Sequence, residues 1–304
     1  MHLDPSLFRY LNEHDWNVLF HIEKLSRKVA HVPEVLIVRH SPESNSATTR
    51  AISTCHRLKL LSHTGVPCSA FRLTSLGADF LAVRAILDKV ELVSIGPQVG
   101  VGKEADIHIC AMESGQQVVL KLHRLGRTSF RKGVHDKRDY EKGQGAKGPA
   151  SWHRVSRESA RAEAHNLVIA YEGGLRVPKL LAHSRHCILM TVAPGVPLNQ
   201  FHKVDSSETT TRLYGMALGF ILDLAAMGYV HCDINEFNLI LDDADGQLDL
   251  TLLDFPQMIP VTHRDAAEMF DRDVANLVAF FRRRFHFDPD EVPTWSDVVA
   301  TNEA

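Results

Sequence analysis

One stretch of eight residues carries side chains at a spacing that suits chemistry on a hydroxyl group and a metal ion. Residues 231–238 read His-Cys-Asp-Ile-Asn-Glu-Phe-Asn, which fits the pattern H-x-D-x-x-x-x-N. In this pattern the aspartate, here Asp233, orients a hydroxyl and accepts its proton, and the asparagine, here Asn238, holds a metal ion. Such a motif also occurs by chance, so it needs support from elsewhere in the chain.

A second acidic motif follows at a distance that fits the first. Asp254 ends the apolar pair Leu252-Leu253 and opens the sequence Asp-Phe-Pro-Gln, sixteen residues after Asn238. An aspartate in this position can bind the metal ion that bridges the phosphates of a nucleotide. Together, the order and spacing of the two motifs indicate phosphoryl transfer.

The upstream half of the chain contains residues that could hold the nucleotide. Lys121 ends the apolar run Val118-Val-Leu-Lys, and Glu163 occurs 42 residues later in a segment with helical periodicity. We expect Lys121 to bind the α and β phosphates and to pair with Glu163. A glycine turn over 99–102 would let backbone N–H groups approach phosphate oxygens. The candidates in and after this turn are Gly100, Gly102, Lys103 and Glu104.

Each of these residues has a simpler explanation when it is taken alone. Lys121 would be a solvated lysine at a strand end, and His231 a hydrogen-bonded histidine of the core. Glu163 would be an exposed salt-bridge partner on a helix, and Glu158 is an alternative to it. The occurrence of all these features in one sequence order favours a kinase-like nucleotide site.

Composition limits the class of protein. The chain has 304 residues, 44% of them hydrophobic and 23% charged, which indicates one or two soluble domains. It excludes a collagenous, wholly disordered or membrane-spanning chain. The five cysteines contain no C-x-x-C pair, so we expect neither a disulfide framework nor a zinc site. No signal-peptide pattern opens the chain, which predicts a cytoplasmic or nuclear protein without a membrane partner.

Charge is unevenly distributed along the chain. The net charge of −3 combines +3 over residues 1–90, −3 over 91–120, +6 over 121–147 and −9 over 148–304. Residues 124–148 are polar and rich in glycine, which predicts a flexible basic loop. A basic front half favours a large anionic partner such as RNA, bound through its phosphates.

The first 90 residues have the pattern of a winged helix-turn-helix domain. Asp15 is the expected cap of a first helix, Pro33 opens a second helix, and residues 46–60 form a third. A hairpin over 60–73 is the predicted wing, and Thr74 caps the next helix.

The remaining residues alternate strands and helices, which predicts an α+β fold for the whole chain. We expect a kinase N-lobe over 91–192, with a helix at 156–171 and a strand at 177–181. A C-lobe would occupy 193–304, with a helix over 209–228. Only 50 residues follow Asp254. That is too few for the activation segment and peptide-binding subdomain of an ordinary protein kinase, so the predicted fold is a trimmed two-lobe kinase.

Several of these segments resemble the RIO atypical protein kinases. The resemblance is carried by Gly100–Ile107, Leu120–Arg131, His231–Asn238 and Asp254–Met258, and it spans roughly residues 5–285. Residues 120–131, Leu-Lys-Leu-His-Arg-Leu-Gly-Arg-Thr-Ser-Phe-Arg, are highly specific to this family. More narrowly, the chain resembles the second RIO subfamily, which carries an N-terminal winged helix.

The resemblance implies a role for each candidate residue. Lys121 would be the ATP-binding lysine, Glu163 its partner and Asp233 the catalytic aspartate. Asn238 and Asp254 would bind Mg²⁺, and Met190–Val192 would meet adenine through backbone groups. The family's aspartate at the position of Asp254 is implied as a transient phosphate acceptor, so the enzyme would act mainly as an ATPase.

The resemblance also implies a biological setting. The family acts in cytoplasmic maturation of the small ribosomal subunit. The implied partners are the pre-40S particle and ribosomal RNA, bound through the winged helix and the basic loop, and the implied location is the cytoplasm with passage through the nucleus.

Three residues depart from the family pattern. Ala105 replaces a serine that helps to hold phosphate, Cys232 replaces a glycine, and Ile234 replaces a phenylalanine or leucine. These changes at Ala105 and Cys232 keep one alternative open, a catalytically silent module that binds RNA or the pre-ribosomal particle. A second alternative is a conventional Ser/Thr kinase acting on protein substrates.

Overall fold

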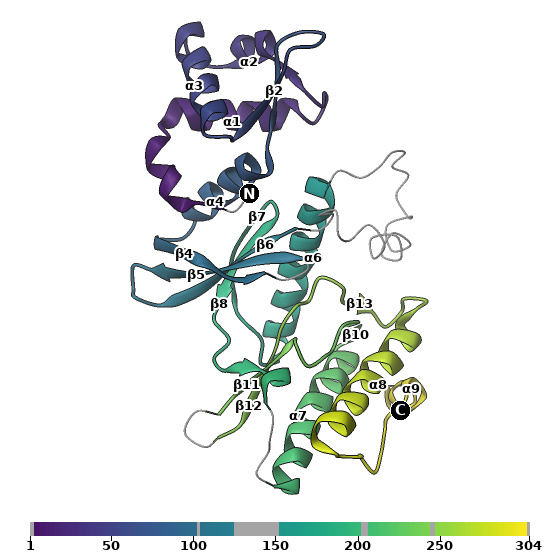
Figure 1. Ribbon diagram of the computed structural model, residues 1–304. Helices are drawn as coiled ribbons and strands as arrows, with labels where there is room; N and C mark the ends of the chain where they lie inside the picture. Colours follow the sequence, from purple (N-terminus) through teal and green to yellow (C-terminus); the bar gives the residue numbers. More distant parts are fainter. Residues whose placement is uncertain (1–2, 102–103, 125–151, 202–205, 244–246, 303–304) are drawn as a thin grey trace.

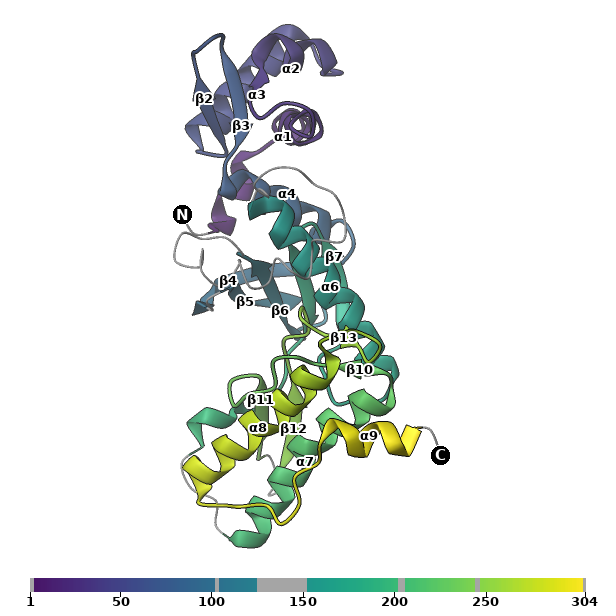
Figure 2. The ribbon, with the colours of Figure 1, turned by 90° about the vertical axis from the view of Figure 1, so that its right-hand side faces the viewer.

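The computed structural model describes residues 3–101, 104–124, 152–201, 206–243 and 247–302 (Figure 1). Gly102 and Lys103 lie outside the described residues, as does all of the predicted basic loop except Arg124. The N-terminal unit, the N-lobe and the C-lobe follow one another from top to bottom in Figures 1 and 2.

The N-terminal unit, residues 3–90, contains the helices and the hairpin that the sequence predicts. Its strands pair antiparallel in the order β1-β3-β2. The elements are η1 (Pro5–Tyr10), α1 (Glu13–Leu25), β1 (Val32–Pro33), α2 (Glu34–His40), α3 (Asn45–Arg57), β2 (Leu61–Thr64), β3 (Ala70–Leu73) and α4 (Ser75–Leu87). The short strand β1 has no counterpart among the sequence predictions.

Side-chain caps explain where two of these helices begin. Asn12 caps α1 by accepting N–H groups from His14 and Asp15, while the Asp15 carboxylate accepts the N–H of Asn12 at 2.9 Å. This reciprocal capping box starts the helix one turn earlier than expected, so the prediction of Asp15 as the cap was wrong. Thr74 caps α4 as predicted, because its Oγ1 accepts the N–H of Gly77 at 3.1 Å.

The N-lobe is a five-stranded antiparallel sheet with one long helix. Its strand order is β4-β5-β6-β8-β7. The elements are β4 (Leu92–Val101), β5 (Ala105–Met112), β6 (Gln117–His123), α6 (Trp152–Glu172), β7 (Leu180–Ser184) and β8 (Cys187–Thr191). Two expectations were wrong: Gly100 lies within β4, opposite Ile107, instead of in a turn, and the strand expected from Val177 begins at Leu180.

The C-lobe is mostly helical. It contains β9 (Val196–Pro197), η4 (Leu198–Gln200), α7 (Ser207–Ala226), β10 (Tyr229–Val230), β11 (Leu239–Asp242), β12 (Asp249–Leu252), β13 (Ile259–Pro260), α8 (Ala266–Phe285) and α9 (Trp295–Asn302). The strands form two small sheets, β12-β11-β9 and β10-β13, beside α7 and α8 (Figure 2). In the described part of the chain, no helix combines the length and the apolar character needed to cross a membrane.

Two hydrophobic cores hold these parts together. One core is continuous between the N-terminal unit and the N-lobe, because α4 packs Phe80 and Ile86 into the same cluster as Leu120 and Leu122 of β6. The other core joins α6 to α7 and α8. Successive side chains of a strand point to opposite faces, so β6 presents its leucines to α4 and Lys121 to the other side. The domain boundary expected at residue 90 therefore does not separate two hydrophobic cores, because one core contains residues from both sides of it.

Candidate active site

Lys121 lies between two carboxylates from distant parts of the chain. Its Nζ donates to Glu163 Oε1 and to Asp254 Oδ1, each at 2.6 Å. The Lys121 side chain is 10% exposed and that of Glu163 is 2% exposed, whereas 35% of the Asp254 side chain meets solvent. The expected contact between Lys121 and Glu163 is present. Glu158, the alternative partner, is 51% exposed and lies 3.8 Å from Arg154.

Helical periodicity explains why Glu163 points inward. Ala160, Ala164 and Leu167 are buried in the core on the same face of α6. Asn166 of that helix donates from Nδ2 to the carbonyl oxygen of Phe255 at 2.8 Å. Helix α6 therefore supplies the partner of Lys121 and also anchors the residue that follows Asp254.

Asp254 has an unusual backbone conformation. Its φ of 68° lies in the left-handed region, which residues other than glycine rarely adopt. The residues on both sides are fixed by hydrogen bonds: Leu253 donates its N–H to the carbonyl oxygen of Asn238 at 2.8 Å, and Phe255 accepts from Asn166. This turn directs the Asp254 carboxylate toward Lys121.

The electrostatic balance keeps all three groups ionised. Burial lowers the pKa of Lys121, but the facing carboxylates of Asp254 and Glu163 outweigh it and raise that pKa above its ordinary value. Burial raises the pKa of both acids, yet Lys121 holds each below its usual range. Solvent screens Asp254 more than Glu163 because about a third of its side chain is open.

His123 adds a neighbour on the far side of Glu163. Its Nε2 lies 2.8 Å from Glu163 Oε2 without hydrogen-bond geometry, and its Nδ1 lies 3.1 Å from the hydroxyl of Ser159. Both carboxylate oxygens of Glu163 therefore have a nitrogen of β6 within 3 Å, which fixes the side chain between strand and helix.

Asp233 and Asn238 lie in one tightly bonded loop. Asn238 Nδ2 donates to the carbonyl oxygen of Asp233 at 2.9 Å. The Asp233 carboxylate accepts from Asn235 Nδ2 at 3.2 Å and from Gln257 Nε2 at 3.4 Å. The carbonyl oxygen of Asn238 also accepts the N–H of Leu253, which is the residue directly before Asp254. The structure thus brings the two motifs together.

Asp273 of α8 anchors this loop, and the sequence analysis missed it. Its carboxylate accepts the N–H groups of Cys232 at 2.8 Å and of Ile234 at 3.3 Å. Burial raises the pKa of Asp273 to about 7, although Arg272 opposes the shift. The sequence did contain one indication of this role. Asp273 falls on the same apolar face of its helix as Phe270 and Val274, where a buried aspartate needs hydrogen-bond partners.

His231 is buried, but it lacks the hydrogen bonds expected of a core histidine. Neither ring nitrogen meets hydrogen-bond geometry with a described residue, and the ring packs edge-on against Phe255 with centroids 4.8 Å apart. Burial lowers its pKa to about 4, so the imidazole is neutral at physiological pH.

The side chains present suit a magnesium ion. Mg²⁺ prefers oxygen ligands and is commonly held by one or two protein side chains together with phosphate oxygens. The Asn238 amide nitrogen is tied to Asp233, which leaves the amide oxygen on the opposite side, and the Asp254 carboxylate is partly open to solvent. These two residues fit the metal-binding roles expected of them.

The other nucleotide candidates lie along the N-lobe sheet. Glu104 precedes β5, and its carbonyl oxygen accepts the N–H of Arg124 at 2.6 Å. Met190 is buried in β8 opposite Val119, and Val192 follows the end of that strand, where the chain continues into the C-lobe.

Comparison with known proteins identifies the family. Residues 106–292 match the RIO domain, and residues 8–89 match the Rio2 N-terminal domain. The chain belongs to the RIO family, in its Rio2 branch. It is 38% identical over 297 residues to the serine/threonine-protein kinase rio2 of Dictyostelium discoideum, covering 98% of this chain and 55% of that protein. The RIO2 kinase of Saccharomyces cerevisiae is also 38% identical, over 95% of this chain and 68% of its own length.

Solved Rio2 structures share the fold over almost the whole chain. The ADP/Mg²⁺-phosphoaspartate complex of Rio2 kinase from Chaetomium thermophilum has a TM-score of 0.87 at 34% identity and covers 99% of this chain and 89% of that one. A second crystal structure of Rio2 kinase from the same organism has a TM-score of 0.83 at 36% identity. The chain is thus a Rio2 N-terminal domain followed by a RIO domain, although it spans only about half the length of the Dictyostelium relative.

Cys232, at a position where the family resemblance implies a glycine, has a backbone conformation that suits glycine. Its φ is 69°, a conformation that favours glycine. The Cys232 N–H donates to Asp273 and its carbonyl oxygen accepts from Arg272 Nη2, and these two bonds hold this conformation despite the side chain. The other RIO departure of interest, Ala105, is buried at the start of β5 and pairs with His123 of β6.

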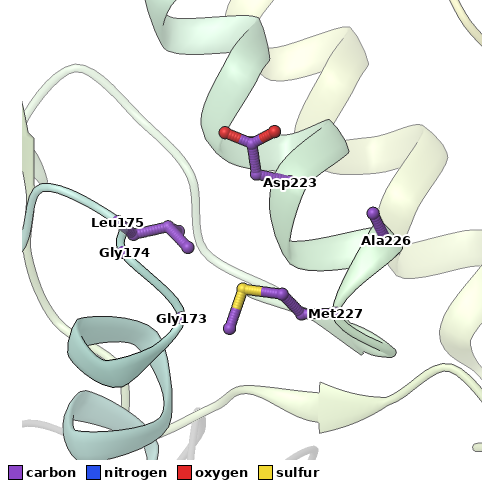
Figure 3. A pocket seen from close by; sticks show the side chains of 6 residues that line it. All are labelled: Gly173, Gly174, Leu175, Asp223, Ala226 and Met227. Atoms are coloured by element: carbon purple, nitrogen blue, oxygen red, sulfur yellow. The ribbon is translucent and has the colours of Figure 1, made fainter.

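A surface hollow of about 360 Å³ lies away from these RIO site residues. It is formed where α6 and α7 end and is lined by Gly173, Gly174, Leu175, Asp223, Ala226 and Met227 (Figure 3). None of the candidate residues contributes to it.

Proposed function

We propose that this chain is a magnesium-dependent atypical serine/threonine kinase that acts mainly as an ATPase, with Asp254 as a transient phosphate acceptor. The observation that carries the proposal is the position of Lys121, which bonds Glu163 and Asp254 at once. The lysine expected to hold phosphates therefore touches the expected acceptor. The related Chaetomium structure, described as an ADP/Mg²⁺-phosphoaspartate complex, supports this reaction.

The reaction would proceed in two steps. A carboxylate oxygen of Asp254 attacks the γ-phosphorus of ATP, the bond between that phosphorus and the bridging oxygen breaks, and ADP leaves with the electron pair. Water then attacks the acyl phosphate, inorganic phosphate leaves, and the carboxylate is restored. Asp233 orients the water and accepts its proton.

Each remaining side chain assists through charge or position. Lys121, fixed by Glu163, binds the α and β phosphates. Asn238 and Asp254 would hold Mg²⁺, which neutralises charge on the phosphates when it is bound. Because the phosphate would pass to Asp254 and then to water, release of inorganic phosphate should exceed phosphorylation of added peptides.

Labelling with γ-³²P-ATP and Mg²⁺ tests this mechanism. The wild-type chain should hydrolyse ATP and carry a label that hydroxylamine removes, as expected of an acyl phosphate. Asp254→Asn should carry no such label, and Asp233→Ala should lose turnover by about 10²–10⁴-fold. Asp249→Asn is the matched control, because Asp249 starts strand β12 and pairs with Arg176 at 2.7 Å, outside the site.

The outcomes separate the alternatives. Peptide phosphorylation at the rate of ATP consumption would favour a conventional Ser/Thr kinase. Absence of any ATP-dependent shift in thermal unfolding with Mg²⁺ present would favour a catalytically silent module. Unchanged hydrolysis by Asp233→Ala would remove the role assigned to that residue.

We further propose that the pre-40S ribosomal particle and its RNA are the partners, in the cytoplasm with passage through the nucleus. The family resemblance and the charge of +6 over residues 121–147 support this. Helix α3 adds exposed cations and hydroxyls that suit phosphate contacts: Thr49, Arg50, Ser53 and Arg57.

Co-sedimentation with pre-40S particles tests the partner. The wild-type chain should bind in a salt-dependent way and leave when ATP is turned over, whereas Asp233→Ala should accumulate on the particles. Equal, salt-independent sedimentation with and without particles would contradict the proposal.

A further inference from the structure

Two buried acids of the N-terminal unit bind arginines of the kinase N-lobe. Glu23 lies on α1 and Asp79 on α4, and both are buried. Burying a carboxylate is costly unless it is paired and hydrogen-bonded, so such contacts specify how two parts of a protein pack. The ion pairs therefore fix the N-terminal unit on the N-lobe at two points.

Glu23 holds two arginines from different elements. Arg185, in the turn between β7 and β8, donates from Nε and Nη2 to the two carboxylate oxygens, each at 2.7 Å. Arg157 of α6 donates from Nη2 to Glu23 Oε1. Arg185 also donates from Nη1 to the carbonyl oxygen of Leu81 on α4 at 2.9 Å. Glu23 thus connects the N-terminal unit to helix α6.

Asp79 forms a bidentate salt bridge with Arg124. Arg124 Nη1 and Nη2 donate to its two carboxylate oxygens at 2.5 and 2.8 Å, and His186 Nε2 lies 2.9 Å from Oδ1. The side chains of Asp79, Arg124 and His186 are all almost completely buried. Arg124 had been expected to open a flexible loop; burial and paired bonds make that expectation wrong for this residue.

From Arg124 the hydrogen bonds continue toward the glycine segment. Arg124 Nε donates to Asp106 Oδ2 at 2.8 Å. Gln98 Nε2 donates to Asp106 Oδ1 at 2.9 Å and to the carbonyl oxygen of Gly100 at 3.2 Å. The backbone of Gly100, a candidate for the phosphate site, is therefore linked to α4 of the N-terminal unit.

Arg124 and Arg157 lie close in sequence to Lys121 and Glu163. Arg124 is three residues after Lys121, directly beyond β6, and Arg157 is six residues before Glu163 on α6. A strand and a helix move as stiff units, so the positions of Lys121 and Glu163 depend on how β6 and α6 are held. A misplacement of about 1 Å in a site of this kind can have large effects.

We propose that Glu23 and Asp79 are positioning residues for the nucleotide site, which hold α6 and β6 where Lys121 and Glu163 meet. This rests on the proposed function, in which ATP binds at Lys121. A nucleic acid or protein that displaces α1 or α4 would then weaken ATP binding, and ATP would weaken its binding by the same factor.

Nucleotide affinity of the full-length chain tests the proposal. Glu23→Gln and Asp79→Asn remove the charge and keep the size of each side chain. Each should weaken binding of ATP with Mg²⁺ by about 5- to 20-fold. The control is Glu43→Gln, because Glu43 forms its contacts within the N-terminal unit, with His14 at 2.9 Å and Asn17 at 3.3 Å. It should bind ATP as the wild type does.

A double-mutant comparison separates positioning from general destabilisation. If Glu23 acts through the lysine, Glu23→Gln should add almost nothing to the loss of ATP affinity caused by Lys121→Ala. The same fold-loss in both backgrounds would overturn the proposal, even if thermal unfolding showed a less stable protein. Glu23→Asp, which retains the charge, should recover most of the affinity.

The two proposals fail in different ways. Wild-type affinity in both Glu23→Gln and Asp79→Asn would overturn the positioning role and leave the proposed ATPase intact. A wild-type chain that binds no ATP would remove the proposed function and this inference with it.

Discussion

At the scale of single residues, this protein depends on buried charges that come from distant parts of the chain. Lys121 meets Glu163 and Asp254, Arg124 meets Asp79, and Glu23 meets two arginines. Removing one partner from such a set leaves an uncompensated buried charge, which costs more than the intact pair contributes. Substitutions that keep size and change only charge are therefore the informative ones.

Asp273 provides a residue-scale prediction about pH. Its folded-state pKa of about 7 lies above the ordinary value of 3.8, so between these values the folded protein holds a proton that the unfolded chain has released. The stability from this group is fully present below pH 3.8 and is lost as the pH rises through 7. Relative to Asp273→Asn, the wild type should lose roughly 2–4 kcal/mol of unfolding free energy between pH 4 and 7.5.

Denaturant unfolding of both proteins across this pH range measures the difference. The asparagine variant should start about 1 kcal/mol less stable at low pH, because its amide NH2 group cannot accept a backbone N–H, whereas the hydroxyl oxygen of the protonated Asp273 still can. Other titrating groups are common to both proteins and cancel in the comparison. Parallel stability curves for the two proteins would contradict the prediction.

At the scale of elements, local rules predicted most of the helices and strands but few of their exact ends. Thr74 was identified as a cap because a threonine before an apolar helical stripe is a local signal. Asn12 and Asp15 are both good capping residues, and only their reciprocal bonds decide between them. Strand β1, with two residues, is too short to show any alternation and exists because it pairs with β3.

The candidate site shows the same division between local and long-range information. Spacing along the chain was enough to nominate Lys121, Glu163, Asp233, Asn238 and Asp254, which the fold brings into two neighbouring groups. The roles of Asp273 and Arg124 were not predicted, because neither residue belongs to a motif whose spacing names its partner, as the lysine and glutamate spacing does for Lys121 and Glu163. Only the packing of α8 on the loop and of α4 on the sheet reveals them.

At the scale of the whole molecule, the shared core makes the N-terminal unit part of the kinase N-lobe. Phe80 is fully buried in α4 and stacks on Phe8 with ring centroids 4.4 Å apart, in the same cluster as Leu120 and Leu122 of β6. A continuous core with buried ion pairs at its edge should unfold as one unit. For the N-terminal unit to move alone, the shared hydrophobic core and the buried ion pairs would both have to break.

Phe80→Ala tests this whole-molecule coupling. Loss of the buried ring should cost about 3–5 kcal/mol, and amide hydrogen exchange should show β6 losing protection together with α3. Phe270→Ala is the matched control, because Phe270 is equally buried in the core beneath α7 and α8, and it should affect α7 without lowering the relative protection of α3. If β6 kept its protection in Phe80→Ala while α3 lost it, the N-terminal unit and the N-lobe would be independent folding units. Coupling from α1 and α4 to Lys121 would then depend on the ion pairs alone.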